Sequence, residues 1–201
     1  MNRRLPAVLL CLCGALLAGL ARGSVLGAPT ITGDAFDLAS GQLLYRELYF
    51  CDGGATDLAG NCEVVYEDPE GGVIARKSID YSRSLQAPVL TINDYRQARE
   101  LTLDFTDQPD LVVDAGFDNF VRIKWDTLVQ GEPVRFPFLV AGRDSPLKMR
   151  AHSDDSADCG ADELCLAISL DSWLLGSLVD PIELTYARDS RRLLRFRGIS
   201  N

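Results

Sequence analysis

Short segments in which apolar and polar side chains alternate recur along most of the chain from residue 42 onward. Alternation with a period of two places the apolar side chains on one face of a β-strand. Alternating segments and short apolar runs of strand length occupy residues 42–50, 64–66, 73–81, 88–92, 101–105, 111–113, 134–140, 147–151, 164–170, 182–186 and 194–196. About ten strands at such regular intervals predict a mainly β fold, which is an antiparallel curved sheet, an open barrel or a sandwich.

The clearest hairpin in this pattern joins residues 64–66 to residues 73–81. The turn at 69–72 reads Pro-Glu-Gly-Gly, in which proline fixes φ and glycine accepts the positive φ that tight turns require. The returning strand carries its apolar residues on one face, except that Lys77 also falls on that face. The pattern therefore predicts an antiparallel pair with one cation on its apolar side.

One segment departs from the strand pattern. Between residues 117 and 130, apolar side chains recur at helical spacing, at Phe117, Phe120, Val121, Trp125, Leu128 and Val129. Asp118 stands where a residue that caps a helix N-terminus is expected, and Gly131 stands where a helix ends. We therefore predict one substantial helix over residues 117–130. The alternative is a strand, because residues 121, 123 and 125 also alternate.

The aromatic side chains of this predicted helix are candidates for a binding site. If the helix covers an open sheet, Phe117, Phe120 and Trp125 line an apolar pocket. Packing of the same rings in a core without any pocket is the simpler alternative. The pattern of the sequence is compatible with both arrangements.

The first 23 residues have the organisation of a secretory signal peptide. Arg3 and Arg4 form a short basic region, and an apolar run follows from about residue 5 to residue 20. Small residues at positions 21 and 23 precede the expected cleavage before Ser24. Cleavage after Gly27 or Ala28 is a nearby alternative.

There are two alternatives to an exported chain from which the signal peptide has been cleaved: an uncleaved anchor and a lipoprotein. An uncleaved segment would remain as an N-terminal anchor, but the apolar run is shorter than a typical membrane span. A lipoprotein would need a modified cysteine after the apolar run, whereas Cys11 and Cys13 lie inside it. We therefore expect residues 24–201 to form a single β-rich domain that is periplasmic or secreted and has no membrane span after cleavage.

Loss of the signal peptide makes an acidic chain more acidic. The whole chain has 20 Lys and Arg against 29 Asp and Glu. Removal of Arg3, Arg4 and Arg22 leaves 17 against 29, a net charge of about −12. A strongly acidic surface repels phosphate backbones. Nucleic acid is therefore not an expected partner.

The signal peptide also takes two of the six cysteines with it. The four that remain, Cys51, Cys62, Cys159 and Cys165, are an even number in an oxidising compartment, which indicates disulfides. Of the three possible pairings, proximity favours Cys51–Cys62 and Cys159–Cys165, each of which closes a short polar loop. Free thiols or a crossed pairing is the alternative, and the spacing does not fit a structural zinc site.

No motif in the sequence specifies catalysis, a nucleotide or a metal ion, so we predict no catalytic residue and no cofactor. His152 is the only histidine, and we expect it to be solvated at a strand end. The acidic residues 154–163 lack the ligand spacing of an EF-hand. Arg195 and Arg197 share one face of the last strand and would suit an anionic partner, although a solvated outer face is the simpler interpretation.

Several stretches together resemble an uncharacterised group of exported proteobacterial proteins. They are residues 40–47, 66–71, 75–81, 115–118 and 195–201. The resemblance spans most of the mature chain, but its motifs are turns and strands. It therefore implies an exported β-rich protein and implies no activity.

Together these observations favour a non-enzymatic binding or envelope-associated protein that recognises an apolar small molecule or a partner protein. One alternative is a hydrolase in which two carboxylates converge in a cleft. Another is a structural component of the envelope. The sequence does not name the ligand.

Overall fold

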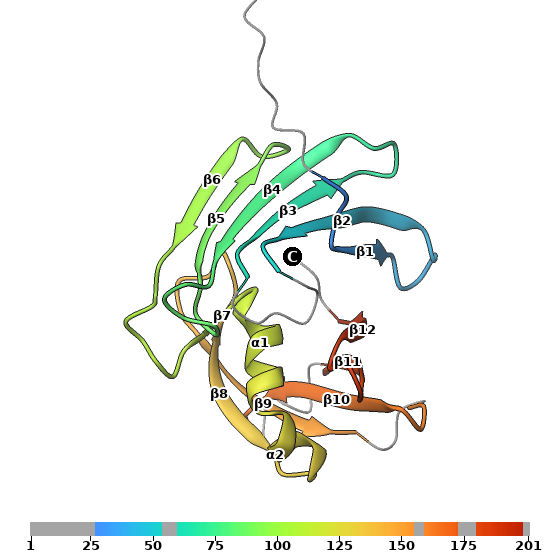
Figure 1. The fold of residues 1–201 in the computed structure, drawn as a ribbon, viewed down its shortest axis with the longest axis vertical. Helices are drawn as coiled ribbons and strands as arrows, with labels where there is room; N and C mark the ends of the chain where they lie inside the picture. Colours follow the sequence, from blue (N-terminus) through green and yellow to red (C-terminus); the bar gives the residue numbers. More distant parts are fainter. Residues whose placement is uncertain (1–26, 54–59, 155–158, 173–179, 199–201) are drawn as a thin grey trace, which may run out of the picture.

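The computed structural model describes residues 27–53, 60–154, 159–172 and 180–198. The chain forms two six-stranded sheets, one after the other along the sequence (Figure 1). The first sheet has its strands in sequence order, and all its pairs are antiparallel: β1 (Ile31–Phe36), β2 (Leu43–Cys51), β3 (Cys62–Glu67), β4 (Val73–Asp80), β5 (Val89–Asp94) and β6 (Arg99–Leu103). Figure 1 shows this sheet curling into a half-barrel.

The second sheet also has its strands in sequence order. Its strands are β7 (Val112–Val113), β8 (Val134–Leu139), β9 (Leu147–Ser153), β10 (Glu163–Leu170), β11 (Ile182–Ala187) and β12 (Leu193–Arg197). Its pairs are antiparallel except for β7 with β8, which is parallel. The prediction of a mainly β fold with a curved antiparallel sheet is confirmed.

The strands predicted from alternation are all present, and β1 is an additional one. Its sequence is ITGDAF, in which Gly33 stands where an inward apolar side chain is expected and Phe36 falls on the exposed face. Pairing with β2 along six residues nevertheless makes it a strand. Backbone hydrogen bonds to a neighbour thus override a weak local signal.

A helical segment between β7 and β8 packs on the second sheet (Figure 1). It consists of α1 (Gly116–Ile123) and α2 (Trp125–Val129), with a break at Lys124. The predicted single helix over residues 117–130 is therefore two short helices. Gly131 follows α2 with a φ of 79°, which is the conformation that terminates helices and favours glycine.

The start of α1 depends on a close backbone contact. A Cβ atom at Gly116 would lie 2.2 Å from the carbonyl oxygen of Gln86, so only glycine fits there. Asp118 does not cap the helix as predicted, because the N-cap position is Ala115 and no side chain caps it. Asp118 lies inside the first turn and makes other contacts, described below.

The two residues of β7 join the two hydrophobic cores. Because successive side chains of a strand point to opposite faces, Val112 lies in the core of the second sheet and Val113 in the core of the first. β8 repeats this arrangement, since Phe138 packs against the second core and Leu139 belongs to the first. The parallel pairs Val112–Phe138 and Val113–Leu139 therefore couple both sheets.

Both predicted disulfides are present. Cys51 and Cys62 are bonded where β2 and β3 pair directly, and Cys159 is bonded to Cys165 in β10. Each closes a short loop, which limits the freedom of the unfolded chain. The proximity argument from the sequence is confirmed.

Candidate functional site

The concave face of the first sheet carries an unusual mixture of aromatic and charged side chains. Strand register places one residue from each strand in a continuous row across this face: Ile31, Tyr49, Val64, Lys77, Ile92 and Leu101. The next row contains Glu47 opposite Tyr66. Lys77 thus occupies the middle of an otherwise apolar row, as its position in the hairpin pattern predicted.

Burial of this face is uneven. On β4–β6 one row of side chains is enclosed, with Ile79 and Leu90 exposed by 2% and 0%, while Ile92 and Leu101 in the neighbouring row are partly exposed. At the β1–β3 end Tyr45, Tyr49 and Tyr66 are only partly buried. The aromatic part of the concave face therefore remains partly open to solvent, although burial around the hydroxyls of Tyr49 and Tyr66 still raises their pKa values.

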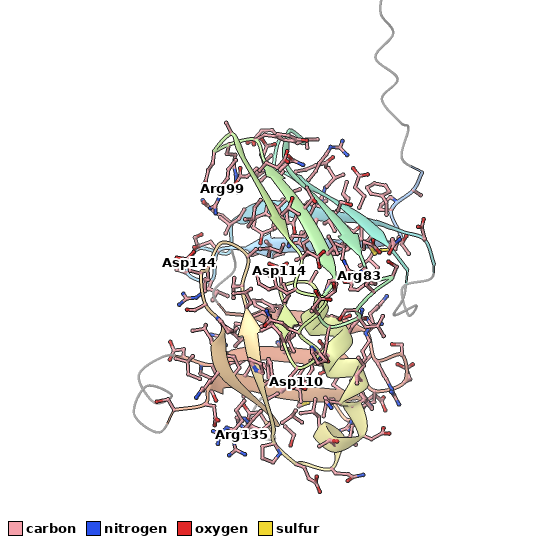
Figure 2. All side chains as sticks on the ribbon, turned by 90° about the vertical axis from the view of Figure 1, so that its left-hand side faces the viewer. Arg83, Arg99, Asp110, Asp114, Arg135 and Asp144 are labelled. Atoms are coloured by element: carbon pink, nitrogen blue, oxygen red, sulfur yellow. A yellow bond between two sulfur atoms is a disulfide. The ribbon has the colours of Figure 1, made fainter. Side chains whose placement is uncertain are left out.

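Lys77 and Asp114 form a buried ion pair at the base of this open surface. The Lys77 Nζ lies 2.7 Å from Oδ1 of Asp114, and the two side chains are 12% and 5% exposed. The backbone N–H of Ala141 donates to the other carboxylate oxygen at 3.4 Å. Figure 2 shows Asp114 between the two sheets. This pair neutralises the only cation in the central row.

The backbone at Asp114 adopts a positive φ of 39°. Among residues other than glycine, aspartate and asparagine adopt this conformation most readily. The Asp114 N–H donates to the carbonyl of Leu139, which keeps the residue in place after β7. The strained position thus directs a carboxylate toward Lys77.

Ionisation at the site follows from burial and from this ion pair. Burial raises the pKa of the Tyr66 hydroxyl to about 12, and the nearby Lys77 opposes the rise. Burial by itself would lower the pKa of Lys77, but its interactions with Tyr66 and Asp114 outweigh that effect and raise it. At neutral pH the face therefore presents a neutral Tyr66 and a charged, paired Lys77. The ammonium lies 5.8 Å from the centre of the Tyr66 ring, within range of a cation–π contact.

A second carboxylate contacts the open end of the face. The hydroxyl of Tyr49 donates to Oε2 of Glu47 at 2.6 Å. Burial, followed by the charge of Glu47, raises the pKa of Tyr49 well above its ordinary value. The rings of Tyr45 and Tyr66 lie 6.0 Å apart and tilted. The open surface is thus built from three tyrosines and Glu47.

Polar contacts continue from this site along α1 to the second sheet. The Tyr81 hydroxyl, just after β4, donates to the carbonyl of Ala115 at 3.1 Å. From β11, the Tyr186 hydroxyl donates to Asp118 at 3.0 Å, and Arg122 forms an ion pair with the same carboxylate at 2.7 Å. Burial raises the pKa of Asp118, and Arg122 opposes that rise. These contacts hold α1 between the two sheets.

The three aromatic residues predicted to line a pocket lie in the core of the second sheet. Phe120 and Trp125 are 3% and 5% exposed, and Phe117 is partly buried against that core. The Phe120 ring lies 4.5 Å from that of Phe136, and Trp125 packs edge-on against Tyr186 at 5.9 Å. Their role in binding a ligand stays a prediction.

Sequence reasoning missed the tyrosines of the first sheet and Asp114 as site residues. The available signal was Lys77, a cation on an apolar strand face, which implies a buried counter-charge. The partner could not be found from spacing, because it lies 37 residues away in the chain. Tyr45, Tyr49 and Tyr66 alternate with other residues in the same way as core residues do.

Other candidate groups in the described part of the chain lead to no catalytic or metal centre. Cys159, Glu163 and Cys165 lie close enough to share a metal ion, but the two sulfurs are bonded to each other. Of the acidic residues in the loop 154–163, Asp155 and Asp158 lie outside the described residues. The buried carboxylates Asp114 and Asp118 are each paired with a cation, as described above.

A hollow of about 520 Å³ lies beside the Cys51–Cys62 disulfide. Its lining includes Asp52, Glu63 and Asp80 and is mainly polar. It therefore lacks the apolar walls that enclose most small-molecule ligands.

Comparison with known proteins finds no matching family model, no matching curated protein and no matching solved structure. The resemblance to a group of exported proteins therefore stays a prediction. No helix among the described residues is long and apolar enough to cross a membrane.

Proposed function

We propose that this protein is exported and binds an uncharged apolar ligand on the concave face of its first sheet. The observation that carries the proposal is the partial exposure of Tyr45, Tyr49 and Tyr66 on that face. Aromatic side chains contribute large apolar contact area, and their hydroxyls orient polar groups of a ligand. The curvature of the sheet adds a concave shape (Figure 1).

The charges of the face favour a neutral ligand over an anionic one. Lys77 is already neutralised by Asp114, so it offers little attraction to a carboxylate or phosphate. Glu47 adds a negative charge at the open end of the face. An anionic amphiphile would therefore meet repulsion, whereas a neutral apolar molecule would not.

Two disulfides support the proposal of export. They pair all four cysteines that follow the expected signal peptide, Cys51 with Cys62 and Cys159 with Cys165. Disulfides persist in oxidising compartments such as the periplasm and are rare in the cytosol. The expected cleavage before Ser24 would leave these cysteines and remove the other two.

The binding test uses the full chain, expressed with its own N-terminal segment and purified after export. The protein is titrated with the neutral fluorophore N-phenyl-1-naphthylamine and, separately, with dodecanoate as an anionic competitor. We expect saturable fluorescence enhancement with the neutral probe and little displacement by dodecanoate. Tyr45→Ala should weaken binding about tenfold, because it removes a partly exposed aromatic contact.

The matched control is Tyr95→Ala. Tyr95 follows β5 and is 53% exposed, so this variant removes a tyrosine away from the rows that form the candidate site. Its probe affinity should equal that of the unmodified protein. Equal losses in both variants, or absence of any saturable probe binding, would overturn the proposed site. Capture of an envelope protein without probe binding would favour the partner-protein alternative.

A further inference from the structure

The outward face of the second sheet, opposite the helices, has a composition unlike that of the rest of this acidic chain. Strand register places small side chains in its middle, at Cys165, Ala167 and Ser169 on β10 and Thr185 on β11. Long cationic side chains stand on either side: Arg135, Lys148 and Arg150 on β8 and β9, and Arg195 and Arg197 on β12. Figure 2 shows Arg135 on the side of the sheet away from the helices.

Some of these cations have partners and others do not. Arg135 is paired with Asp171 at 3.2 Å, and Arg197 is paired with Glu183 at 3.3 Å. Lys148, Arg150 and Arg195 form no ion pair with any part of the chain that the structure describes. On a chain with a large excess of carboxylates, three cations without a partner on one face form a local positive surface.

Three buried polar atoms that have no hydrogen-bond partner among the described residues lie on the same face. They are Nε of Arg150, Nδ1 of His152 and Oγ of Ser169. Ser169 is paired directly with Arg150 across β9 and β10, and His152 is two residues from Arg150 on the same side of β9. A buried polar atom left without a partner costs about 1–3 kcal/mol, so such atoms are rarely grouped together without a role.

The chemistry of the three groups is that of an oxyanion site. The Arg150 Nε–H and the Ser169 hydroxyl donate hydrogen bonds, and an imidazole protonated at Nδ1 donates a third. All three side chains are partly exposed as whole residues, while the three polar atoms themselves are buried, so a ligand reaches them only after the side chains rotate.

We propose that Arg150, His152 and Ser169 bind a soluble phosphate-type oxyanion, such as inorganic phosphate or a phosphate monoester, on the outward face of the second sheet. Lys148 supplies additional positive charge beside Arg150 on the same strand face. Arginine provides several N–H donors in a planar arrangement that suits phosphate oxygens. This site is separate from the concave face of the first sheet and does not depend on the function proposed for it.

The test exploits the fact that the chain has one histidine. Untagged protein labelled with ¹⁵N shows one imidazole spin system, which reports on the site without further assignment. Addition of inorganic phosphate at constant pH and ionic strength, set with chloride, should shift this signal saturably. Arg150→Gln should weaken phosphate binding at least about tenfold, as expected for loss of a charge-assisted hydrogen bond.

Two further variants and one control sharpen the result. Ser169→Ala should weaken binding about threefold, in line with the loss of one neutral donor. His152→Asn should retain most of the phosphate affinity, because the asparagine amide replaces Nδ1. His152→Ala should lose that affinity. Calorimetry measures both variants, since neither contains a histidine. Arg96→Gln is the control, since Arg96 is an exposed arginine of the first sheet. Its phosphate affinity should be unchanged.

The outcomes separate the possible sources of the anion. No saturable shift at millimolar phosphate, or equal affinity in Arg150→Gln and Arg96→Gln, would overturn the proposal. Binding only to vesicles that contain phosphatidylglycerol, with no effect of free phosphate, would also overturn it and indicate a membrane-surface role. If Arg150→Gln unfolds, Lys148→Gln replaces it, with an expected loss of about threefold from the removal of one exposed charge.

Discussion

The two sheets have the same number of strands and nearly the same simple order, but their inner faces are covered differently. On the second sheet α1 and α2 lie over the strands, and the core between them is apolar and aromatic. On the first sheet Val64, Ile79 and Leu90 are enclosed, while Tyr45, Tyr49 and Tyr66 on β2 and β3 remain partly exposed. One sheet is thus completed by the chain itself and the other is only half covered.

The difference arises from the connections between strands. The first sheet is built from hairpins such as β3–β4, whose turn over residues 68–72 is too short to cover a face. The longest connection of the second sheet, from β7 to β8, forms the helices. Alternation predicts inward-facing side chains equally well in both sheets. Whether those side chains are enclosed depends on what the connections place over them.

The largest expected contrast is between Phe120 in the covered core and Tyr45 on the open face. Phe120→Ala should lower the free energy of unfolding by about 3–5 kcal/mol, because it leaves a cavity beside Phe136. Tyr45→Ala should lower it by less than about 1 kcal/mol, because the ring is partly exposed in the folded chain. Urea unfolding at neutral pH measures both. Equal losses would mean that the first sheet is covered as fully as the second.

The next largest effect is the loss of stability when the buried Lys77–Asp114 ion pair beside the first sheet is broken. Asp114→Asn keeps a residue that tolerates the positive φ of 39° and leaves Lys77 buried without a counter-charge. The expected loss of stability is about 3 kcal/mol, at the lower end for a broken buried pair because Lys77 retains slight contact with water. Urea unfolding again measures the change.

Asp107→Asn provides the control for that variant. Asp107 is 98% exposed and lies 3.7 Å from Arg83 in an exposed pair, so its loss should change stability by less than about 0.5 kcal/mol. Adding Lys77→Met to Asp114→Asn should recover part of the loss, because no unpaired charge then remains. If the two aspartate variants behave alike, Lys77 is solvated and the open face carries an available cation.

The parts of this structure that local chemistry determines were predictable from the sequence. Alternation located eleven of the twelve strands in the described residues, and the exception, β1, has Gly33 where an inward apolar side chain is expected. Cysteine spacing identified both disulfides. The helical period was recognised, but the break at Lys124 was not, because the apolar spacing continues through it.

The candidate sites depended on contacts between residues far apart in the chain. Asp118 had the correct position for a helix cap, yet its carboxylate contacts Tyr186, which lies 68 residues further on. His152 was expected to be solvated, whereas its Nδ1 is buried without a partner. Neither outcome follows from neighbours in the sequence, since each depends on how strands and helices meet.

The smallest expected effect is on the ionisation of the buried tyrosines, which can be compared between the two sheets. Burial raises the pKa of Tyr66 to about 12 and also raises the pKa values of Tyr49, Tyr81 and Tyr186. Tyr49 and Tyr66 lie on strands of the first sheet, and Tyr81 directly follows its strand β4. Tyr186 lies on β11 of the second sheet. Four of the six tyrosines should therefore remain neutral at pH 11 in the folded protein, as measured by absorbance at 295 nm.

The sign of the linked change in stability follows from the raised pKa values. The folded chain holds the tyrosine proton more tightly than the unfolded chain does, so the full contribution to stability is present below about pH 10. It is lost as the pH rises through the value of about 12 for Tyr66. Tyr66→Phe should therefore reduce the slope of stability against pH between these values, whereas Tyr95→Phe, at a residue that is 53% exposed, should leave it unchanged. A slope that Tyr66→Phe does not alter would show that the Tyr66 hydroxyl is solvated, and that the half-covered face admits water as far as Lys77.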